Sequence, residues 1–130
     1  MNIRRHILCA SLLIAAGPTV ALAADYRCKV EAKFDPEHIS SNEEIGKDQF
    51  SILIEEKGES AFLSRCSLSD PQMTCERYKV DKVVFNESPK ITKFYVFDSQ
   101  FDVQLYSDLS FVENKGNGGM SFGRCSTVAK

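Results

Sequence analysis

Several features are scarce or missing in this sequence, and each absence excludes a class of protein. The chain has no surplus of positive charge, because its 16 basic residues are outnumbered by 18 acidic ones. A basic surface for nucleic-acid phosphates is therefore not expected. With 130 residues, the chain is too short for two ordinary domains. Its hydrophobic content of 43% allows a buried core, which excludes disorder.

Signatures of catalysis are also missing. Beyond residue 23 the only histidine is His38, and a Ser-His-Asp or Cys-His system needs an imidazole beside its nucleophile. No P-loop and no G-x-S-x-G, H-E-x-x-H or G-x-G-x-x-G pattern occurs. The acidic residues between positions 35 and 48 lack the ligand spacing of a calcium loop, so we interpret them as a solvated face. We expect a non-enzymatic protein with no metal and no cofactor.

The first 23 residues have the three parts of a cleavable secretory signal peptide. Arg4-Arg5 precedes an apolar segment at 7–16, and Ala21-Leu22-Ala23 forms an A-x-A cleavage site. A Gly-Pro pair interrupts the apolar segment well short of the roughly 20 residues that span a bilayer. Cleavage is therefore favoured over a membrane anchor. We expect a single β-rich domain at 24–130 that is periplasmic or secreted.

Cysteine content fits this compartment. Cleavage after residue 23 would remove Cys9 and leave an even number of cysteines, which predicts two disulfides in an oxidising environment. Zinc is disfavoured because the chain has no C-x-x-C pair and a single histidine beyond the signal. The four cysteines are Cys28, Cys66, Cys75 and Cys125.

One of the three pairings of these cysteines fits a hairpin. Asp70-Pro71 lies midway between Cys66 and Cys75, so a symmetric turn there places the two cysteines opposite each other. Cys28 then pairs with Cys125 and joins the first strand to the last. In the alternative pairings, Cys66 and Cys75 each bridge to a terminal strand.

Turn residues divide the chain after position 24 into six or seven strand-like segments about ten residues apart. The predicted segments are 25–34, 50–54, 60–68, 73–85, 91–97, 101–111 and 120–128. A turn at Lys57-Gly58 makes the second and third a hairpin, and the Gly-Asn-Gly-Gly segment at 116–119 is a second hairpin turn. One short helix is predicted with Asp35 as its N-cap, Pro36 in its first turn and its end at Gly46.

This pattern leaves no room for parallel crossover helices, so the predicted fold is mainly β. We expect an antiparallel meander that closes into a small disulfide-stapled barrel or sandwich with one short helix. An open sheet packed on the helix is the alternative. If Cys75 faces inward, simple alternation also turns Arg77 and Lys79 inward, which predicts a β-bulge near them or a different register.

Three strand-like segments carry large apolar residues on both faces, which a sheet with one solvated face does not need. They are 52–54, 83–85 and 94–97. Either the helix and loops cover the second face, or this face forms an exposed recognition patch or an internal ligand cavity.

Two functional hypotheses follow. The favoured one is a periplasmic protein-binding module, such as an inhibitor or an envelope accessory factor, whose partner is another envelope or extracellular protein. Rigid aromatic side chains dominate such interfaces, and the expected anchors are Phe94, Tyr95, Phe97 and Tyr106. The alternative is a carrier of a small apolar ligand, with a barrel lumen lined by Phe101, Val103 and Leu105.

Both ends of the predicted domain resemble a known pattern. Tyr26-Arg27-Cys28 and Phe122-Gly123-Arg124-Cys125 are similar to the ends of small disulfide-closed periplasmic β-proteins, among which are inhibitors of c-type lysozyme. The Ser-Gly loop motif of those inhibitors is missing from this sequence, so the resemblance assigns no inhibitory residues.

Overall fold

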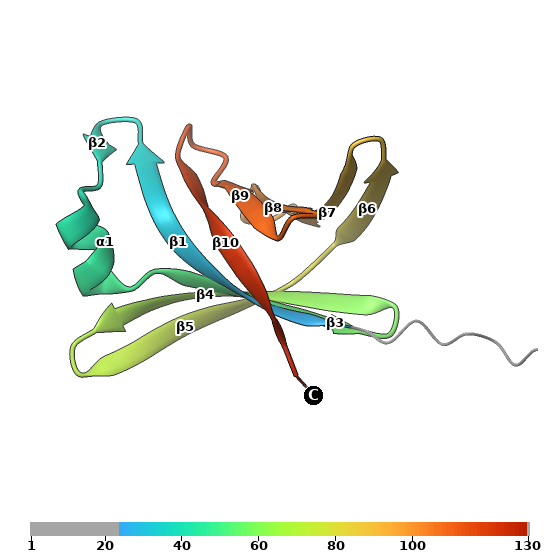
Figure 1. The fold of residues 1–130 in the computed structure, drawn as a ribbon, viewed down its shortest axis with the longest axis horizontal. Coiled ribbons are helices and arrows are strands. Elements are labelled where there is room, and N and C mark those ends of the chain that lie inside the picture. The colour runs from blue at the N-terminus through green and yellow to red at the C-terminus, as the bar shows by residue number, and fades with distance from the viewer. Residues whose placement is uncertain (1–23, 130) are drawn as a thin grey trace, which may run out of the picture.

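A computed structural model shows one curved antiparallel sheet and one short helix (Figure 1). It describes residues 24–129, so the predicted signal peptide and Cys9 lie outside the described part. The elements are β1 (Asp25–Asp35), β2 (His38–Ile39), α1 (Asn42–Asp48), β3 (Ser51–Lys57), β4 (Ser60–Ser69), β5 (Gln72–Lys79), β6 (Lys82–Glu87), β7 (Lys90–Val96), β8 (Phe101–Tyr106), β9 (Ser110–Asn114) and β10 (Met120–Val128). The prediction of a mainly β fold with one short helix is confirmed.

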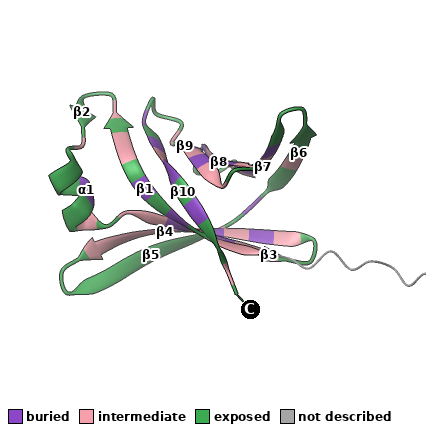
Figure 2. Ribbon diagram, in the orientation of Figure 1, coloured by how far each residue is buried: buried purple, intermediate pink, exposed green. Residues whose placement is uncertain are grey.

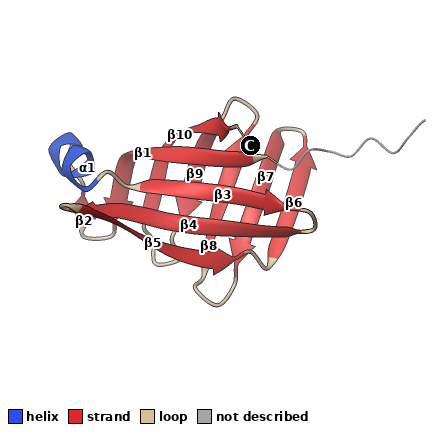
Figure 3. Ribbon diagram, turned by 90° about the horizontal axis from the view of Figure 1, so that it is seen from below, coloured by secondary structure: helices blue, strands red, loops and turns tan. Residues whose placement is uncertain are grey.

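The sheet consists of two meanders that meet at the terminal strands. Its strand order is β5-β4-β3-β1-β10-β9-β8-β7-β6, with β2 attached to β1. The first and last strands therefore pair, as predicted, and Cys28 lies opposite Cys125 in their register. The strands β1 and β3–β5 run across β6–β9 when seen from below (Figure 3), so the two halves of the curved sheet face each other.

Closure of this sheet is incomplete between β5 and β6. Within residues 24–129 these two end strands have no ladder between them, so the sheet is not closed as a barrel. We call their unpaired edges the seam. At the link between them, the Val80 amide donates to the Ala61 carbonyl at 2.9 Å and the Asp81 amide donates to the Tyr95 carbonyl at 2.8 Å. Because the chain changes partner within these two residues, the predicted single strand at 73–85 was wrong.

The segment 101–111 is likewise two strands. After β8 the chain turns at Asp108, whose carboxylate accepts a hydrogen bond from the Ser110 amide at 2.9 Å. Leu109 takes a left-handed conformation with φ 67°. A short polar side chain that bonds to the backbone two residues ahead stabilises a turn, and here it splits one predicted strand into the hairpin β8–β9. The hairpins β3–β4 and β9–β10 lie where the sequence predicted them.

Helix α1 begins six residues later than predicted. Its N-cap is Ser41, whose hydroxyl accepts from the Glu44 amide at 3.2 Å while the Glu44 carboxylate accepts from the Ser41 amide at 3.4 Å. This reciprocal capping box satisfies two backbone donors at once. Asp35 instead pairs with His38 in the β1–β2 hairpin, which a helix starting at Pro36 would abolish.

Alternation along β5 turns Cys75 outward. Cys75 is exposed together with Arg77 and Lys79, whereas Tyr78 is half-buried and packs against the core. The β4–β5 ladder is regular and sets Cys66 opposite Cys75. Of the two outcomes expected near Arg77 and Lys79, the β-bulge is therefore absent from this ladder and the different register is observed. A register irregularity does occur in the β1–β10 ladder, in β1 beside Val30.

The core lies between the two halves of the sheet. Buried and exposed positions alternate along β10 (Figure 2), as expected for strands with one face inward. The largest fully buried apolar side chains are Phe94, Phe111, Ile54, Leu63 and Val103. The structure joins Cys28 to Cys125 inside this core and Cys66 to Cys75 at the β4–β5 hairpin, which is the pairing that the sequence favoured.

Candidate functional site

The predicted aromatic anchors do not form one patch. Phe94 is 0% exposed and belongs to the core, so its predicted role as an anchor is corrected: its side chain has no surface to offer a partner. Tyr95 and Phe97 lie together, with ring centroids 6.2 Å apart. Tyr106 is half-buried opposite Ile91, at the other end of the β7–β8 ladder.

Exposed apolar side chains gather on the hairpin of β6 and β7. Val83 is 48% exposed, Phe85 is 58% exposed and Phe97, directly after β7, is 57% exposed. Val83 is paired with the buried Phe94, which places Val83 and Phe85 on the inward-facing side of β6. Helix α1 packs mainly on β1 and β4 and so leaves this hairpin uncovered. Phe97 and the half-buried Tyr95 lie on the outer side. We call Val83 and Phe85 on the inward side, together with Tyr95 and Phe97 on the outer side, the β6–β7 surface.

The backbone of β6 is also available at this surface. Among the described strands β6 pairs with β7 alone, so its other edge presents N–H and C=O groups toward the seam. Such an edge can add a strand from another chain. Exposed lysines, Lys79 and Lys82, lie on the two sides of the link that joins the seam strands.

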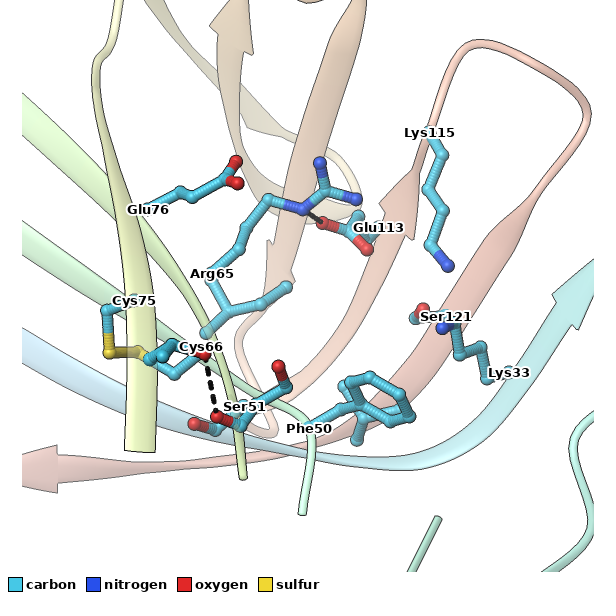
Figure 4. Close-up of a pocket in the computed structure, with 14 residues that line it drawn as sticks. Lys33, Phe50, Ser51, Arg65, Cys66, Cys75, Glu76, Glu113, Lys115 and Ser121 are labelled. Atoms are coloured by element: carbon cyan, nitrogen blue, oxygen red, sulfur yellow. Dashed lines mark hydrogen bonds and ion pairs between the residues drawn. A yellow bond between two sulfur atoms is a disulfide. The ribbon is translucent and has the colours of Figure 1, made fainter. Parts of the chain in front are cut away.

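A second feature is a polar cavity of about 270 Å³ on the inward side of the sheet (Figure 4). It lies at the end of the fold where β4 and β5 face the β9–β10 hairpin. Its polar lining side chains are Lys33, Ser51, Arg65, Ser67, Thr74, Glu76, Glu113, Lys115 and Ser121.

An ion pair crosses this cavity between the two halves of the sheet. The Arg65 Nε lies 2.9 Å from Glu113 Oε2, and the Glu113 side chain is only 4% exposed. This contact brings the charges together without hydrogen-bond alignment, so within residues 24–129 Glu113 Oε2 receives no hydrogen bond. The Arg65 guanidinium also stacks 4.8 Å from the centre of the Phe101 ring. Burial of such a pair carries a desolvation cost.

Two lysines enter the cavity from the other side. The Lys115 side chain is 11% exposed, and its Nζ lies 3.4 Å from Asp35 Oδ1. Burial, reinforced by the neighbouring Lys33 ammonium, lowers the pKa of Lys115, while the carboxylates of Asp35 and Glu113 act in the opposite direction. The Lys33 Nζ lies 3.9 Å from the centre of the Phe50 ring.

Glu76 completes the charged lining on the β5 side. Its carboxylate accepts a hydrogen bond from the Tyr78 hydroxyl. This bond, together with burial of the phenol, raises the pKa of Tyr78. Glu76 is paired with Arg65 in the β4–β5 ladder, so both side chains point inward from neighbouring strands.

The apolar residues proposed for a ligand lumen are packed in the core instead. Phe101, Val103 and Leu105 belong to the same buried cluster as Phe94 and Phe111. The cavity beside them is lined mainly by charged and hydroxyl side chains, with Val30, Phe50 and Ile52 as its apolar members. This arrangement does not favour a carrier of an apolar ligand.

Sequence reasoning missed the polar cavity, although a signal for it exists. Leu63 and Phe111 are inward positions, and strand alternation places the residues two further along, Arg65 and Glu113, on the same face. Charged residues of opposite sign at inward positions of two strands indicate a buried pair.

His38 lies on the surface, as expected, but in β2 and not in the helix. Its Nε2 is 2.8 Å from Glu44 Oε2. This hydrogen bond lowers the pKa of the Glu44 carboxyl.

Comparison of the chain with family models, curated proteins and solved structures finds no match. In the part of the chain that the structure describes, no helix has the length and apolar character required to span a bilayer. The two disulfides fit a small module that works in an oxidising compartment.

Proposed function

We propose that this protein is an exported, non-enzymatic module that binds another envelope or extracellular protein through the β6–β7 surface. The observation that carries the proposal is the combination, on one strand, of a free backbone edge with the exposed side chains of Val83 and Phe85. Edge strands of soluble proteins are normally short, charged or covered because they invite pairing. An apolar, uncovered edge is therefore typical of a surface that pairs with a partner.

The chemistry of the surface specifies the partner segment. An extended segment beside β6 would form main-chain hydrogen bonds and would place every second side chain against Val83 and Phe85. Lys79 and Lys82 are exposed beside the seam, so acidic residues at the end of the segment would be favoured. Tyr95 and Phe97, on the outer side of the hairpin, supply the rigid aromatic contacts.

A position-specific crosslink in the producing cells tests this proposal. A photoreactive amino acid replaces Phe85 in one variant and Asn117, in the distant β9–β10 turn, in a control. The expected result is a discrete adduct with one other protein from position 85 and no such adduct from position 117. An adduct of two copies of this chain, or equal adducts from both positions, would contradict the proposal.

A pair of charge substitutions supplies the matched control. Phe85→Lys places an ammonium on the free edge of β6, and Ile39→Lys changes a 69% exposed apolar residue of β2. We expect Phe85→Lys to abolish the adduct formed through a second crosslinker at Val83, and Ile39→Lys to preserve it. Loss in both variants would mean that general surface charge, and not the β6 edge, governs the contact.

A further inference from the structure

We propose that the polar cavity between β4, β5 and the β9–β10 hairpin binds a small zwitterion with one carboxylate and one ammonium group, such as a free amino acid. This site is separate from the β6–β7 surface and does not depend on the function proposed for it. The inference comes from the arrangement of charges in the cavity and from the size of the space.

The charges of the cavity are separated in space. Lys33 enters from β1 and Lys115 from the turn of the β9–β10 hairpin, whereas Glu76 lies on the opposite side of Arg65 (Figure 4). The ion pair of Arg65 with Glu113 lies between these two sides. A ligand with separated charges would match this pattern, with its carboxylate toward the lysines and its ammonium toward Glu76.

Glu113 fixes the centre of this arrangement. Its side chain is 96% buried, and its Oε2 is in ion-pair contact with Arg65 Nε at 2.9 Å. Because Oε2 has almost no accessible surface, a ligand in the cavity would reach the carboxylate of Glu76 and not this oxygen. The buried pair holds the Arg65 guanidinium in the cavity wall between the lysines and Glu76 (Figure 4).

Lys33 and Lys115 form the positively charged side of the cavity. The pKa of Lys115 is lowered by burial and by the Lys33 ammonium, because two like charges share one side of the cavity. The Lys33 ammonium lies over the Phe50 ring, a contact that holds it at the cavity wall. A carboxylate placed near both ammonium groups would offset their repulsion.

The size of the space limits the ligand. A volume of about 270 Å³ is below the roughly 300–1,000 Å³ of pockets that hold drug-sized molecules. Hydroxyl groups of Ser51 and Ser121 also line the cavity, and they can hydrogen-bond either end of a polar ligand. A free amino acid with a small or polar side chain fits this volume and this lining.

The test is a titration of the isotope-labelled, disulfide-intact protein, followed by amide chemical shifts. The probes are L-serine, L-alanine, L-glutamate, sodium acetate, methylammonium chloride and glucose. We expect saturable shifts at Glu76, Glu113 and Lys115 with at least one amino acid, with a Kd of about 1 mM or tighter. Acetate and methylammonium should each bind at least about tenfold more weakly, since each offers one charge only.

Matched variants separate a binding site from a structural ion pair. Lys115→Met and Glu76→Gln each remove a charge from the cavity, and Lys47→Met and Glu87→Gln make the same substitutions at exposed positions outside the cavity lining. The first two should weaken binding about tenfold or more, and the controls should leave it unchanged. Because Glu76 is exposed, Glu76→Gln keeps the test valid if Lys115→Met fails to fold.

Three results would overturn the inference. They are the absence of saturable shifts with every amino acid, equal affinity for acetate alone, and unchanged affinity in the folded variant Glu76→Gln. Because the crosslink from position 85 is measured at the other surface, failure here leaves that result unaffected, and the reverse also holds.

Discussion

The disulfide between the terminal strands should contribute far more to stability than the disulfide of the hairpin. The perturbation is the double substitution Cys28→Ala with Cys125→Ala, which removes the bridge without leaving a free thiol. The two cysteines are 97 positions apart, and the loop-entropy relation gives about 4.7 kcal/mol for a closed loop of that length. Cys28 is also fully buried, so the loss of its sulfur adds a packing cost in the same direction.

The matched control is Cys66→Ala with Cys75→Ala. These residues are 9 positions apart, and the same relation gives about 2.7 kcal/mol. Cys75 is exposed, so little packing is lost with its sulfur. The free energy of unfolding should therefore fall by about 2 kcal/mol more in the Cys28/Cys125 variant than in the Cys66/Cys75 variant.

Urea unfolding followed by circular dichroism measures both losses. Each transition is extrapolated to water with its own slope, because removal of a crosslink expands the unfolded chain and changes the slope. Against a total stability of about 5–15 kcal/mol for a small domain, the difference is readily resolved. Equal losses in the two variants, or a larger loss in the hairpin variant, would refute the argument that the long loop dominates.

Three further outcomes are expected from single substitutions. Gly123→Ala should lower the free energy of unfolding by at least about 2 kcal/mol, because the added Cβ would lie 1.9 Å from a β1 carbonyl oxygen. Gly46→Ala, which adds a Cβ in open space within α1, should raise the free energy of unfolding by about 0.5–1 kcal/mol. Thermal melting of the two variants compares these effects. Ser41→Ala should cost about 1 kcal/mol through loss of the N-cap, as measured by urea unfolding. The pKa of Tyr78 is raised in the folded state, first by its hydrogen bond to Glu76. The free energy of unfolding should therefore fall as the pH rises above 10, and Glu76→Gln should weaken this fall. Spectrophotometric titration of the phenol checks the raised pKa.

Disulfide pairing and strand pairing were accessible from the sequence because local turn chemistry determines them. Asp70-Pro71 can centre only one symmetric hairpin, and that hairpin sets Cys66 opposite Cys75. Once these two are paired, Cys28 and Cys125 have only each other. The pairing of the first and last strands then follows from a covalent bond.

The start of the helix was wrong because two N-terminal signals compete within seven residues. Asp35-Pro36 has a capping residue followed by a proline, whereas Ser41 has a glutamate three positions later. The second signal satisfies two backbone donors, and it leaves Phe34 and Asp35 free to pair with β2. The position of the helix start is therefore decided by the pairing of β1 with β2, which helix propensity does not include.

The faces of β7 could not be assigned from the sequence because large apolar residues occupy both. Strand alternation predicts that Phe94 and Val96 share one face of β7 and that Tyr95 and Phe97 share the other. Alternation alone does not predict which of the two faces is buried. The structure turns Phe94 inward against Val103, so two of the four predicted anchors, Tyr95 and Phe97, lie together on the outer side.

The open seam and the polar cavity have a common physical cause in the composition of β5. Every residue of β5 except Tyr78 is exposed, and the inward positions of Thr74 and Glu76 line the cavity. A strand with polar side chains on its inward face gains little apolar burial from approaching β6. The terminal strands, in contrast, are held by a covalent bond and a long ladder. The sheet is therefore open beside the strand whose inward face is polar, and Val83 and Phe85 of β6 stay exposed there.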